Sequence, residues 1–323
     1  MRAVVRDAYG GSEVLRVDEV PDPAPGPGEV LVRVRASSLN MADLDILLGR
    51  PRVARVFFGI ASPRTPGMGV DLAGEVEEVG ADVTGLRRGD HVWADVFDHG
   101  HSALAERAVA PADALRRIPD GVSFVDAAAV PHSGLLALQV LRSTGSTRPG
   151  ERVLVIGGGG CVGPFAIQLA KAAGAHVTGV DTGAKAALMR EAGADDTIDF
   201  TVDDVTRGGR RFDVVIDIAD AHGLLPLRRL LARRGRYSLL ARRLGSYAEK
   251  ALLGPVVGAT IGARMGTFAW RANSAHQLDE VGRLLAAGAV RPVIDGVHGL
   301  DAVPEMFARL AAGDNRGKIV IEP

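Results

Sequence analysis

The stretch VLVIGGGGCVG, residues 153–163, decides the fold of the middle of this chain. It begins with an uninterrupted apolar run, which is typical of a strand buried on both faces of a parallel sheet. Gly158, Gly160 and Gly163 then satisfy the pattern G-x-G-x-x-G, and residues 161–173 have the apolar spacing of a helix. A buried strand, a glycine turn and a helix in this order predict a dinucleotide-binding unit.

The glycine turn suits phosphates for two physical reasons. Glycines allow a tight turn and let the backbone approach a pyrophosphate, and a helix N-terminus presents unpaired N–H groups at the positive end of its dipole. Cys161, inside the turn, is expected to be mainly a small packing residue. We expect the cofactor contacts of the turn to come from Gly158, Gly159, Gly160, Cys161, Val162 and Gly163.

An acidic residue follows the next predicted strand, residues 176–180. Asp181 lies 181 − 163 = 18 positions after Gly163, close to the roughly 20 expected for an acid that binds the adenosine ribose. Such a carboxylate repels a 2′-phosphate, so the pattern slightly favours NAD(H) over NADP(H). Thr182 and Lys185 are expected in the same site, where Lys185 could soften the repulsion. Alternatively, Asp181 only caps the next helix.

The segments around this unit predict an α/β protein. Strands alternate with helices through the middle of the chain, which is the pattern of a Rossmann doubly wound parallel sheet. We predict strands over residues 213–218 and 236–240, and helices over residues 125–141, 184–192 and 224–232.

The N-terminal part has a different pattern. Short strands separated by Gly and Pro predict a β-rich, partly open barrel-like domain, and the tail is predicted as helix–strand–helix–strand. We therefore expect a catalytic domain over residues 1–117, a Rossmann domain over 118–264 and a return to the catalytic domain over 265–323. The predicted strands of the first part cover residues 4–6, 14–17, 29–36, 74–79 and 91–94.

Composition narrows the functional classes. The 323 residues carry a net charge of −1, so no overall field favours nucleic acid or an anionic membrane. Arginine is dense over residues 228–236 and at Arg242 and Arg243, which is typical of a solvated helix face and loop. The apolar stretch 251–262 is too short to span a bilayer. The absence of an apolar leader and of any cysteine pair indicates a cytoplasmic protein without disulfides.

Several longer segments carry a family resemblance. They are GGSEVLRVDEVPDPAPGPGEVLVRVRASSLNMAD, PGMGVDLAGEVEEVGADVTGLRRGDHV, DAAAVPHSGLLALQVL, EAGADDTIDF and VIDGVHGLDAVPEMFARLAAGDNRGKIVI, in addition to the glycine turn. Together they resemble the medium-chain dehydrogenase/reductase superfamily, in its zinc-free quinone oxidoreductase-like branch. The resemblance implies a GroES-like catalytic domain, a nicotinamide cofactor between the two domains, and a homodimer formed through the Rossmann sheet edge.

The resemblance also shows where zinc ligands are missing. Zinc alcohol dehydrogenases have GHE where this chain reads PGMGVDLAG, with Asp71, and their upstream cysteine is replaced here by Ser37 and Ser38. Cys161 is the single cysteine, which excludes a zinc site built from several thiolates. We therefore expect no bound zinc.

The same comparison suggests catalytic residues. Asn40, in SSLNMAD, matches the family asparagine near the nicotinamide ribose, although a turn-capping role is also open. His132 replaces a small apolar residue and is a possible proton donor, or simply a hydrogen-bonded histidine at a helix start. His99 and His101, with Asp95 and Asp98 nearby, could bind a metal, contact substrate or lie in an exposed loop.

These features predict an NAD(P)H-dependent oxidoreductase that transfers hydride to a quinone or an α,β-unsaturated carbonyl. Its small-molecule pocket is expected between residues 47–65, 96–102 and 260–271. A zinc-free alcohol dehydrogenase or ketoreductase is the alternative within enzymes. Gly159 and Leu136 replace a family serine and threonine, so a non-redox binding protein or cyclase that retains the fold also stays open.

Overall fold

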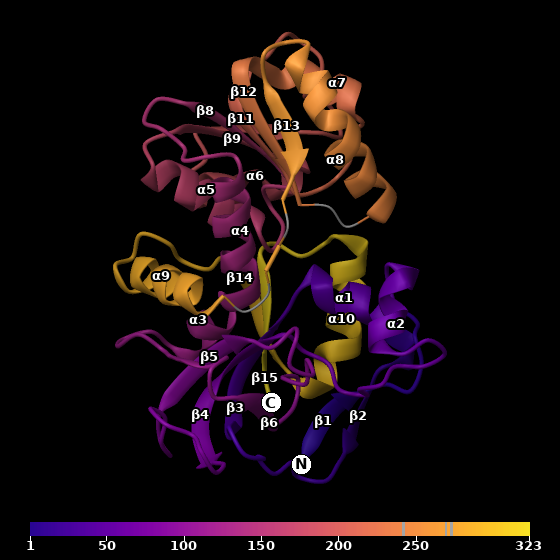
Figure 1. The fold of residues 1–323 in the computed structure, drawn as a ribbon, viewed down its shortest axis with the longest axis vertical. Coiled ribbons are helices and arrows are strands. Elements are labelled where there is room, and N and C mark those ends of the chain that lie inside the picture. The colour runs from indigo at the N-terminus through magenta and orange to yellow at the C-terminus, as the bar shows by residue number, and fades with distance from the viewer. Residues whose placement is uncertain (241–242, 269, 272–273) are drawn as a thin grey trace. The chain divides into compact units, whose positions relative to one another are not determined.

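The computed structural model describes residues 1–240, 243–268, 270–271 and 274–323 (Figure 1). Its contacts divide the chain into two compact units. The N/C unit comprises residues 1–135 and 271–323, and the middle unit comprises residues 136–270. Arg242 and part of the predicted pocket segment 260–271 lie outside the described residues. The catalytic and cofactor-binding roles assigned to 1–117, 118–264 and 265–323 stay predictions.

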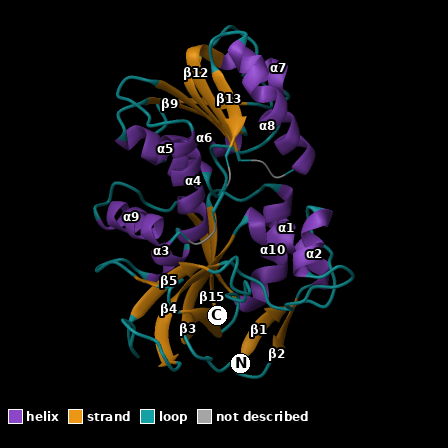
Figure 2. Ribbon diagram, viewed as in Figure 1, coloured by secondary structure: helices purple, strands orange, loops and turns teal. Residues whose placement is uncertain are grey.

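The middle unit is built on a six-stranded sheet with the order β10-β9-β8-β11-β12-β13, and every neighbouring pair is parallel. Helices lie on both sides of this sheet, with α5 on one side and α7 and α8 on the other (Figure 2). The predicted doubly wound Rossmann sheet is therefore confirmed. Its strands are β8 (Arg152–Ile156), β9 (His176–Asp181), β10 (Asp196–Asp199), β11 (Phe212–Asp217), β12 (Leu231–Leu239) and β13 (Arg264–Thr267).

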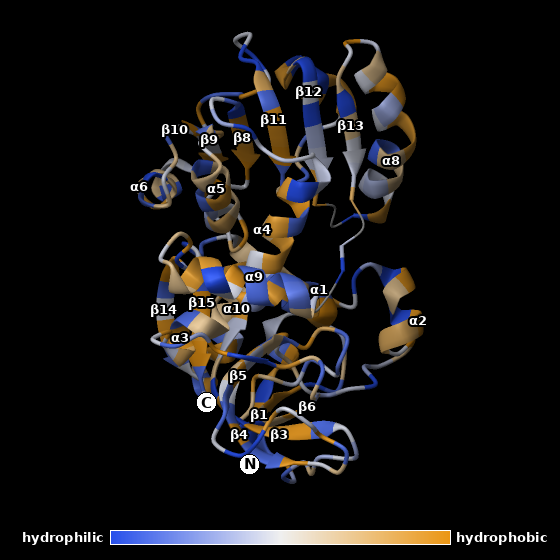
Figure 3. Cartoon of the chain, turned by 60° about the vertical axis from the view of Figure 1, so that its left-hand side comes forward, coloured by the Kyte–Doolittle hydropathy of each residue, from blue (hydrophilic) through white to orange (hydrophobic). Residues whose placement is uncertain are grey.

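The strand order explains where a ligand would bind. From β8 the chain adds β9 and β10 on one side, and then crosses over to add β11, β12 and β13 on the other. Ligands of open parallel sheets bind outside the carboxyl ends of the strands at such a reversal. The glycine turn follows the carboxyl end of β8, at the reversal itself. The two central strands, β8 and β11, consist mainly of hydrophobic residues (Figure 3).

The helices of the middle unit differ from the prediction at several points. The helix predicted over 161–173 begins only at Gly163, because the preceding residues form the glycine turn. Helix α8 and strands β10 and β13 were not predicted, since α8 mixes glycines and Pro255 with apolar residues and lacks a clear period. The helices are α5 (Gly163–Ala172), α6 (Ala186–Glu191), α7 (Leu224–Leu230) and α8 (Leu244–Ala259), and α4 (Pro131–Ser143) enters this unit from the other.

The N/C unit is centred on a seven-stranded sheet with the order β14-β15-β3-β4-β5-β7, in which β6 also pairs with β3. A separate two-stranded sheet joins β1 and β2. The strands are β1 (Arg2–Val5), β2 (Arg16–Glu19), β3 (Glu29–Leu39), β4 (Asp71–Val79), β5 (His91–Asp95), β6 (Arg107–Pro111), β7 (Arg116–Arg117), β14 (Ile294–Gly299) and β15 (Lys318–Glu322).

Two predictions in this unit were wrong in detail. Residues 14–17 are not one strand, because a 3₁₀ turn (Ser12–Val14) precedes β2. Residues 125–141 are not one helix: α3 (Phe124–Ala128) ends before Pro131, which has no N–H group to continue the helix and instead begins α4. The remaining helices are α1 (Met41–Leu48), α2 (Arg55–Phe58), α9 (Ala275–Ala286) and α10 (Val303–Ala312).

Strand β3 brings distant parts of the sequence together. Its end pairs antiparallel with β15, with Ser38 opposite Val320 and Leu39 opposite Ile319. Its other edge pairs with β4, which begins at Asp71. The residues that end β3 and begin β4 and β15 therefore meet in one region of the N/C unit.

Candidate active site

The glycine turn of the middle unit has the shape that a dinucleotide requires. A Cβ added to Gly163 would lie 2.4 Å from the backbone oxygens of Gly157 and Gly158, so this glycine lets α5 approach the turn closely. A Cβ on Gly158 would lie 2.7 Å from the sulfur of Met189. A Cβ on Gly160 would meet nothing nearer than 3.8 Å. Folding itself therefore does not require glycine at position 160, whereas close approach of a pyrophosphate to the backbone does.

Asp181 ends β9 and reaches back to the glycine turn. Its carboxylate accepts hydrogen bonds from the N–H groups of Gly159 and Thr182, both at 2.9 Å. Lys185 places its ammonium 3.6 Å from the same carboxylate, and both side chains are largely buried. Asp181 thus joins the second strand to the turn in the middle unit. Its contact with a ribose stays a prediction.

Lys185 also explains the departure at position 159. A Cβ on Gly159 would lie 2.6 Å from the Lys185 Cβ and 2.7 Å from its Cδ. The lysine stem therefore occupies the space that a serine side chain would need. Cys161 and Val162 are buried immediately before α5, and their contact with a cofactor stays a prediction.

A second polar cluster lies inside the N/C unit, which we call the Lys318 cluster: Ser38, Asn40, Asp71, Ser133 and Lys318. The Lys318 ammonium donates to Asn40 Oδ1 at 2.5 Å and to Asp71 Oδ2 at 3.0 Å. Asn40 Nδ2 donates to Asp71 Oδ2 at 2.8 Å. The hydroxyl groups of Ser38 and Ser133 donate to Asp71 and Asn40. All five residues are buried, so the cluster satisfies its polar groups internally.

Within the Lys318 cluster, the positive charge of Lys318 lies next to the negative charge of Asp71. Burial alone would raise the pKa of Asp71, but Lys318, His132 and hydrogen bonds from Asn40 and Ser38 hold it below its usual value. Asp43 behaves differently: burial and the Asp71 charge raise its pKa to about 7. Asp43 accepts the Asn40 backbone N–H at 2.8 Å and so caps α1. The predicted contact of Asn40 with a nicotinamide ribose stays a prediction, since both ends of its amide are bonded within the cluster.

His132 extends the Lys318 cluster to β5. Its backbone N–H donates to Asp71 Oδ1 at 2.8 Å, and its Nδ1 lies 3.0 Å from Asp95 Oδ2. Burial alone would lower the pKa of His132, but the charges of Asp95 and Asp71 more than offset this and raise it. The sequence pattern drew attention to His132 but missed Asp95 as its partner, because the start of α4 and the end of β5 are 37 residues apart in the chain.

A cavity of about 550 Å³ lies in the middle unit, and another of about 450 Å³ lies in the N/C unit. The second is lined by Phe57 and Phe58 at the end of α2, by Arg64 and Thr65 in the segment that follows, and by Phe97, Asp98, Gly100 and His101 on another loop. Phe97 stacks on the His132 ring with centroids 6.1 Å apart. Two of the loops expected to form the substrate pocket therefore meet next to the His132–Asp95 pair.

The side chain of His101 is buried, although a position in an exposed loop was one of the expectations for it. Burial and the nearby Arg6 guanidinium lower the pKa of His101 to about 4, so its imidazole is neutral at pH 7. Phe58 packs edge-on against the ring, with centroids 5.7 Å apart. Among the described residues, no group of three or more His, Cys, Asp or Glu side chains is arranged to hold a metal ion. His99 and His101 therefore have no third ligand within that part of the chain.

Comparison with known proteins identifies the family of this chain. The model for the alcohol dehydrogenase GroES-like domain matches residues 26–139, and the model for zinc-binding dehydrogenase matches residues 192–321. A quinone oxidoreductase of Pseudomonas aeruginosa is 33% identical, with 98% of this chain and 98% of that protein covered. The chain belongs to the medium-chain dehydrogenase/reductase superfamily.

Other relatives place this member of the superfamily in the zinc-free, quinone oxidoreductase-like branch. The mitochondrial NAD(P)H oxidoreductase RTN4IP1 of Mus musculus is 31% identical, with 99% of this chain and 89% of that protein covered. The solved structure of the quinone oxidoreductase from Coxiella burnetii has a TM-score of 0.87 and 27% identity, covering 100% of this chain and 99% of that one. The words "zinc-binding" belong to the description of the matched family. This chain itself has a single cysteine.

Within the described residues of this family member, no helix is both long and apolar enough to cross a bilayer.

Proposed function

We propose that this chain is an NAD(P)H-dependent, zinc-independent oxidoreductase that transfers hydride to a quinone or an α,β-unsaturated carbonyl. The observation that carries the proposal is the glycine turn, in which packing against the backbone requires glycine at Gly163 but not at Gly160. That distribution suits a turn shaped for a phosphate-bearing ligand. The names of the quinone oxidoreductase relatives support the substrate class.

In this proposal, residues of the middle unit bind the cofactor and residues of the N/C unit supply the proton. The backbone of the glycine turn and the α5 N-terminus would hold the pyrophosphate, and Asp181 would face the adenosine ribose. A bound nicotinamide supplies the hydride. We propose NAD(H) as the preferred cofactor, because the Asp181 carboxylate repels a 2′-phosphate, although Lys185 weakens that repulsion.

In the N/C unit, His132 is the proposed proton donor. Asp95 favours the protonated imidazole, because the carboxylate stabilises its positive charge in a buried setting. Reduction of a conjugated carbonyl or a quinone places negative charge on an oxygen, which a positioned acid neutralises. The cavity beside Phe97, with its three phenylalanines, suits a flat, largely apolar substrate.

Alcohol oxidation is the second candidate activity, and one observation favours it. A neutral His132 held by Asp95 could accept the proton of a hydroxyl group, as a general base does. The alkoxide would still need stabilisation, and the tyrosines offer little: Tyr9 and Tyr237 donate their hydroxyls to Gly59 O and Asp217, and no tyrosine has a lysine four residues later. Conjugate reduction is less demanding, since the developing charge is delocalised.

The assembly and location are further proposals. We propose a homodimer through the β13 edge of the six-stranded sheet, where α8 also leaves Leu252, Leu253 and Val256 exposed. Light scattering with Leu252→Glu as the test variant should show a dimer in the wild type and a monomer in the variant. A cytoplasmic location remains proposed from the cysteine content.

The deciding experiment compares two directions of reaction. NADH and NADPH consumption is followed with a panel of quinones and enones, and NAD⁺ and NADP⁺ reduction with a panel of alcohols. We expect turnover with the first panel and none with the second. Substituting His132→Ala should reduce turnover by about 10²-fold or more if His132 is the acid. Alcohol oxidation with inert enones would overturn the proposal, and cofactor binding without turnover of either panel would favour a non-redox protein.

A further inference from the structure

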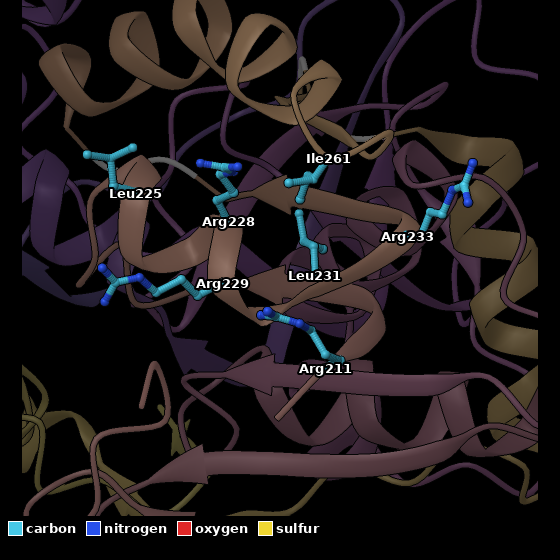
Figure 4. Close-up of a pocket in the computed structure, with 7 residues that line it drawn as sticks. All are labelled: Arg211, Leu225, Arg228, Arg229, Leu231, Arg233 and Ile261. Carbon is cyan, nitrogen blue, oxygen red and sulfur yellow. The ribbon is translucent and has the colours of Figure 1, made fainter. Parts of the chain in front are cut away.

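The cavity of about 550 Å³ in the middle unit is lined by four arginines. Its lining is Arg211, Arg228, Arg229 and Arg233 with three apolar residues, Leu225, Leu231 and Ile261 (Figure 4). We call it the arginine pocket. No aspartate or glutamate of the described residues is part of its lining.

These arginines lack the partners that other arginines of the same unit have. Arg210 pairs with Asp203 at 2.7 Å, and Arg207 pairs with Asp204 at 3.1 Å. Within the part of the chain that the structure describes, no ion pair or hydrogen bond involves the side chains of the four pocket arginines. Four mutually repelling charges around one cavity are stabilised by an anion that binds among them.

The pocket arginines come from three segments that the sheet brings together. Arg211 immediately precedes β11, Arg228 and Arg229 lie in the last turn of α7, and Arg233 lies in β12. In Figure 4, Arg211 and Arg228 flank Leu231 and Ile261, and Arg229 and Arg233 lie further out. A solvated helix end would explain the two α7 residues, since cations near a helix C-terminus are favourable. It does not explain their convergence with Arg211 and Arg233.

The arginine pocket is separate from the glycine turn. Strands β8 and β11 are parallel, with Val214 opposite Val153 and Asp217 opposite Ile156. Arg211 is thus at the amino end of the sheet, whereas the glycine turn follows the carboxyl end of β8. The length of a strand of this size separates the two ends by roughly 15 Å or more. A dinucleotide phosphate held at the turn therefore does not account for the arginines.

We propose that the arginine pocket is a second binding site, for a small organic phosphate. Guanidinium groups bind phosphate oxygens through paired N–H donors, and several of them favour a doubly charged phosphate over a single carboxylate. Leu225, Leu231 and Ile261 offer an apolar surface for the organic part. The volume lies within the range of small-molecule sites, whereas a nucleic acid would need a longer basic stripe.

The test uses phenyl phosphate and inorganic phosphate as probes, in calorimetric titrations at constant ionic strength with NADH present and absent. The pocket variant is Arg211→Gln with Arg228→Gln, and the control is Arg88→Gln, an exposed arginine of the N/C unit. We expect phenyl phosphate to bind wild type and control alike, more tightly than inorganic phosphate, and about tenfold or more weakly to the pocket variant. Leu225→Ser, at an exposed apolar residue of the lining, should weaken phenyl phosphate but not inorganic phosphate.

Three results would overturn the proposal. One is equal binding by the pocket variant and the wild type, and another is binding that disappears when NADH is present, which would assign it to the glycine turn. The third is a change in the oligomeric state of the pocket variant in solution, which would show that the pocket is a contact with a second copy. Thermal unfolding of the double arginine variant, the leucine variant and Arg88→Gln shows whether each tested protein is folded.

Discussion

The Nδ1 atom of His132 lies 3.0 Å from Oδ2 of Asp95, and both side chains are buried. An imidazole in this setting is costly to charge unless a carboxylate compensates for the lost hydration. Asp95 supplies that compensation, and the His132 backbone N–H binds Asp71 at the same time. The pair therefore fixes the ring in place and favours its protonated form.

The first prediction concerns the pH dependence of this pair. Asp95→Asn removes the charge that raises the pKa of His132, so that pKa falls. Activity that needs protonated His132 declines as the pH rises through this pKa. In the variant the decline should begin at a lower pH. The measurement is kcat/KM against pH with a quinone substrate.

Asp120→Asn is the matched control, because Asp120 is exposed and belongs to the same unit. It should leave the profile unchanged. A profile that is identical in wild type and Asp95→Asn would mean that water or the ribose supplies the proton. The stability contributed by the pair follows the same direction: it is fully present below the ordinary histidine pKa and is lost as the pH rises through the raised value.

A second prediction separates two glycines of the same turn. Gly163→Ala places a Cβ 2.4 Å from backbone oxygens and should destabilise the protein by about 1–3 kcal/mol. Gly160→Ala meets nothing within the protein nearer than 3.8 Å and should leave stability almost unchanged. Its effect should instead be at least a tenfold weaker NADH affinity. Urea unfolding and fluorescence titration measure the two quantities, and equal NADH affinity in Gly160→Ala would count against pyrophosphate binding here.

The third prediction compares two lysine–aspartate pairs. Lys318→Met leaves the buried Asp71 carboxylate without its ammonium partner and should cost about 3–5 kcal/mol of unfolding free energy at pH 7. Lys171→Met breaks a partly exposed pair with Asp195 and should cost at most about 1 kcal/mol. The pKa of Asp71 rises in Lys318→Met, so the deficit should shrink as the pH falls and Asp71 becomes protonated. A Lys318→Met variant as stable as the Lys171→Met variant would contradict this account.

Asp181 is the subject of the fourth prediction. Asp181→Asn removes the charge expected to repel a 2′-phosphate, so the ratio of NADPH to NADH affinity should rise about tenfold, or roughly 1.4 kcal/mol. Asp196→Asn, at the other end of the neighbouring strand β10, is the control and should not change the ratio. An unchanged ratio in Asp181→Asn would indicate that the carboxylate serves only to bind the Gly159 and Thr182 N–H groups.

Local patterns predicted the middle unit well. The apolar run of β8, the glycine spacing and Asp181 all lie within a short segment, so their arrangement follows from the sequence. The serine-to-glycine departure at Gly159 was visible, but its cause was not, because the contact with the Lys185 stem depends on how the turn after β9 packs against the glycine turn. Helix α8 was missed since its glycines and Pro255 hide its period.

The N/C unit depends on contacts between residues far apart in the chain. His132 stood out as an unusual residue, yet Asp95 was noticed only as part of a histidine loop. The Lys318 cluster was not predicted, because the register of β3 against β4 and β15 determines it. Strand pairing over such separations leaves no local signal, whereas alternation along β3 was sufficient to predict that strand.

The position of Lys318 has a consequence for how the protein is made. It lies 278 residues after Asn40, and its ammonium lies 3.0 Å from the buried carboxylate of Asp71. A ribosome delivers residues 1–135 well before β15 emerges, whereas the complete middle unit can form its own parallel sheet in the meantime. The N/C unit is therefore incomplete until the last strand is made, and the end of β3 at Ser37–Leu39 is unpaired until then. During translation this edge is the place where premature pairing with another nascent chain would begin, and where a holding chaperone would have most to protect.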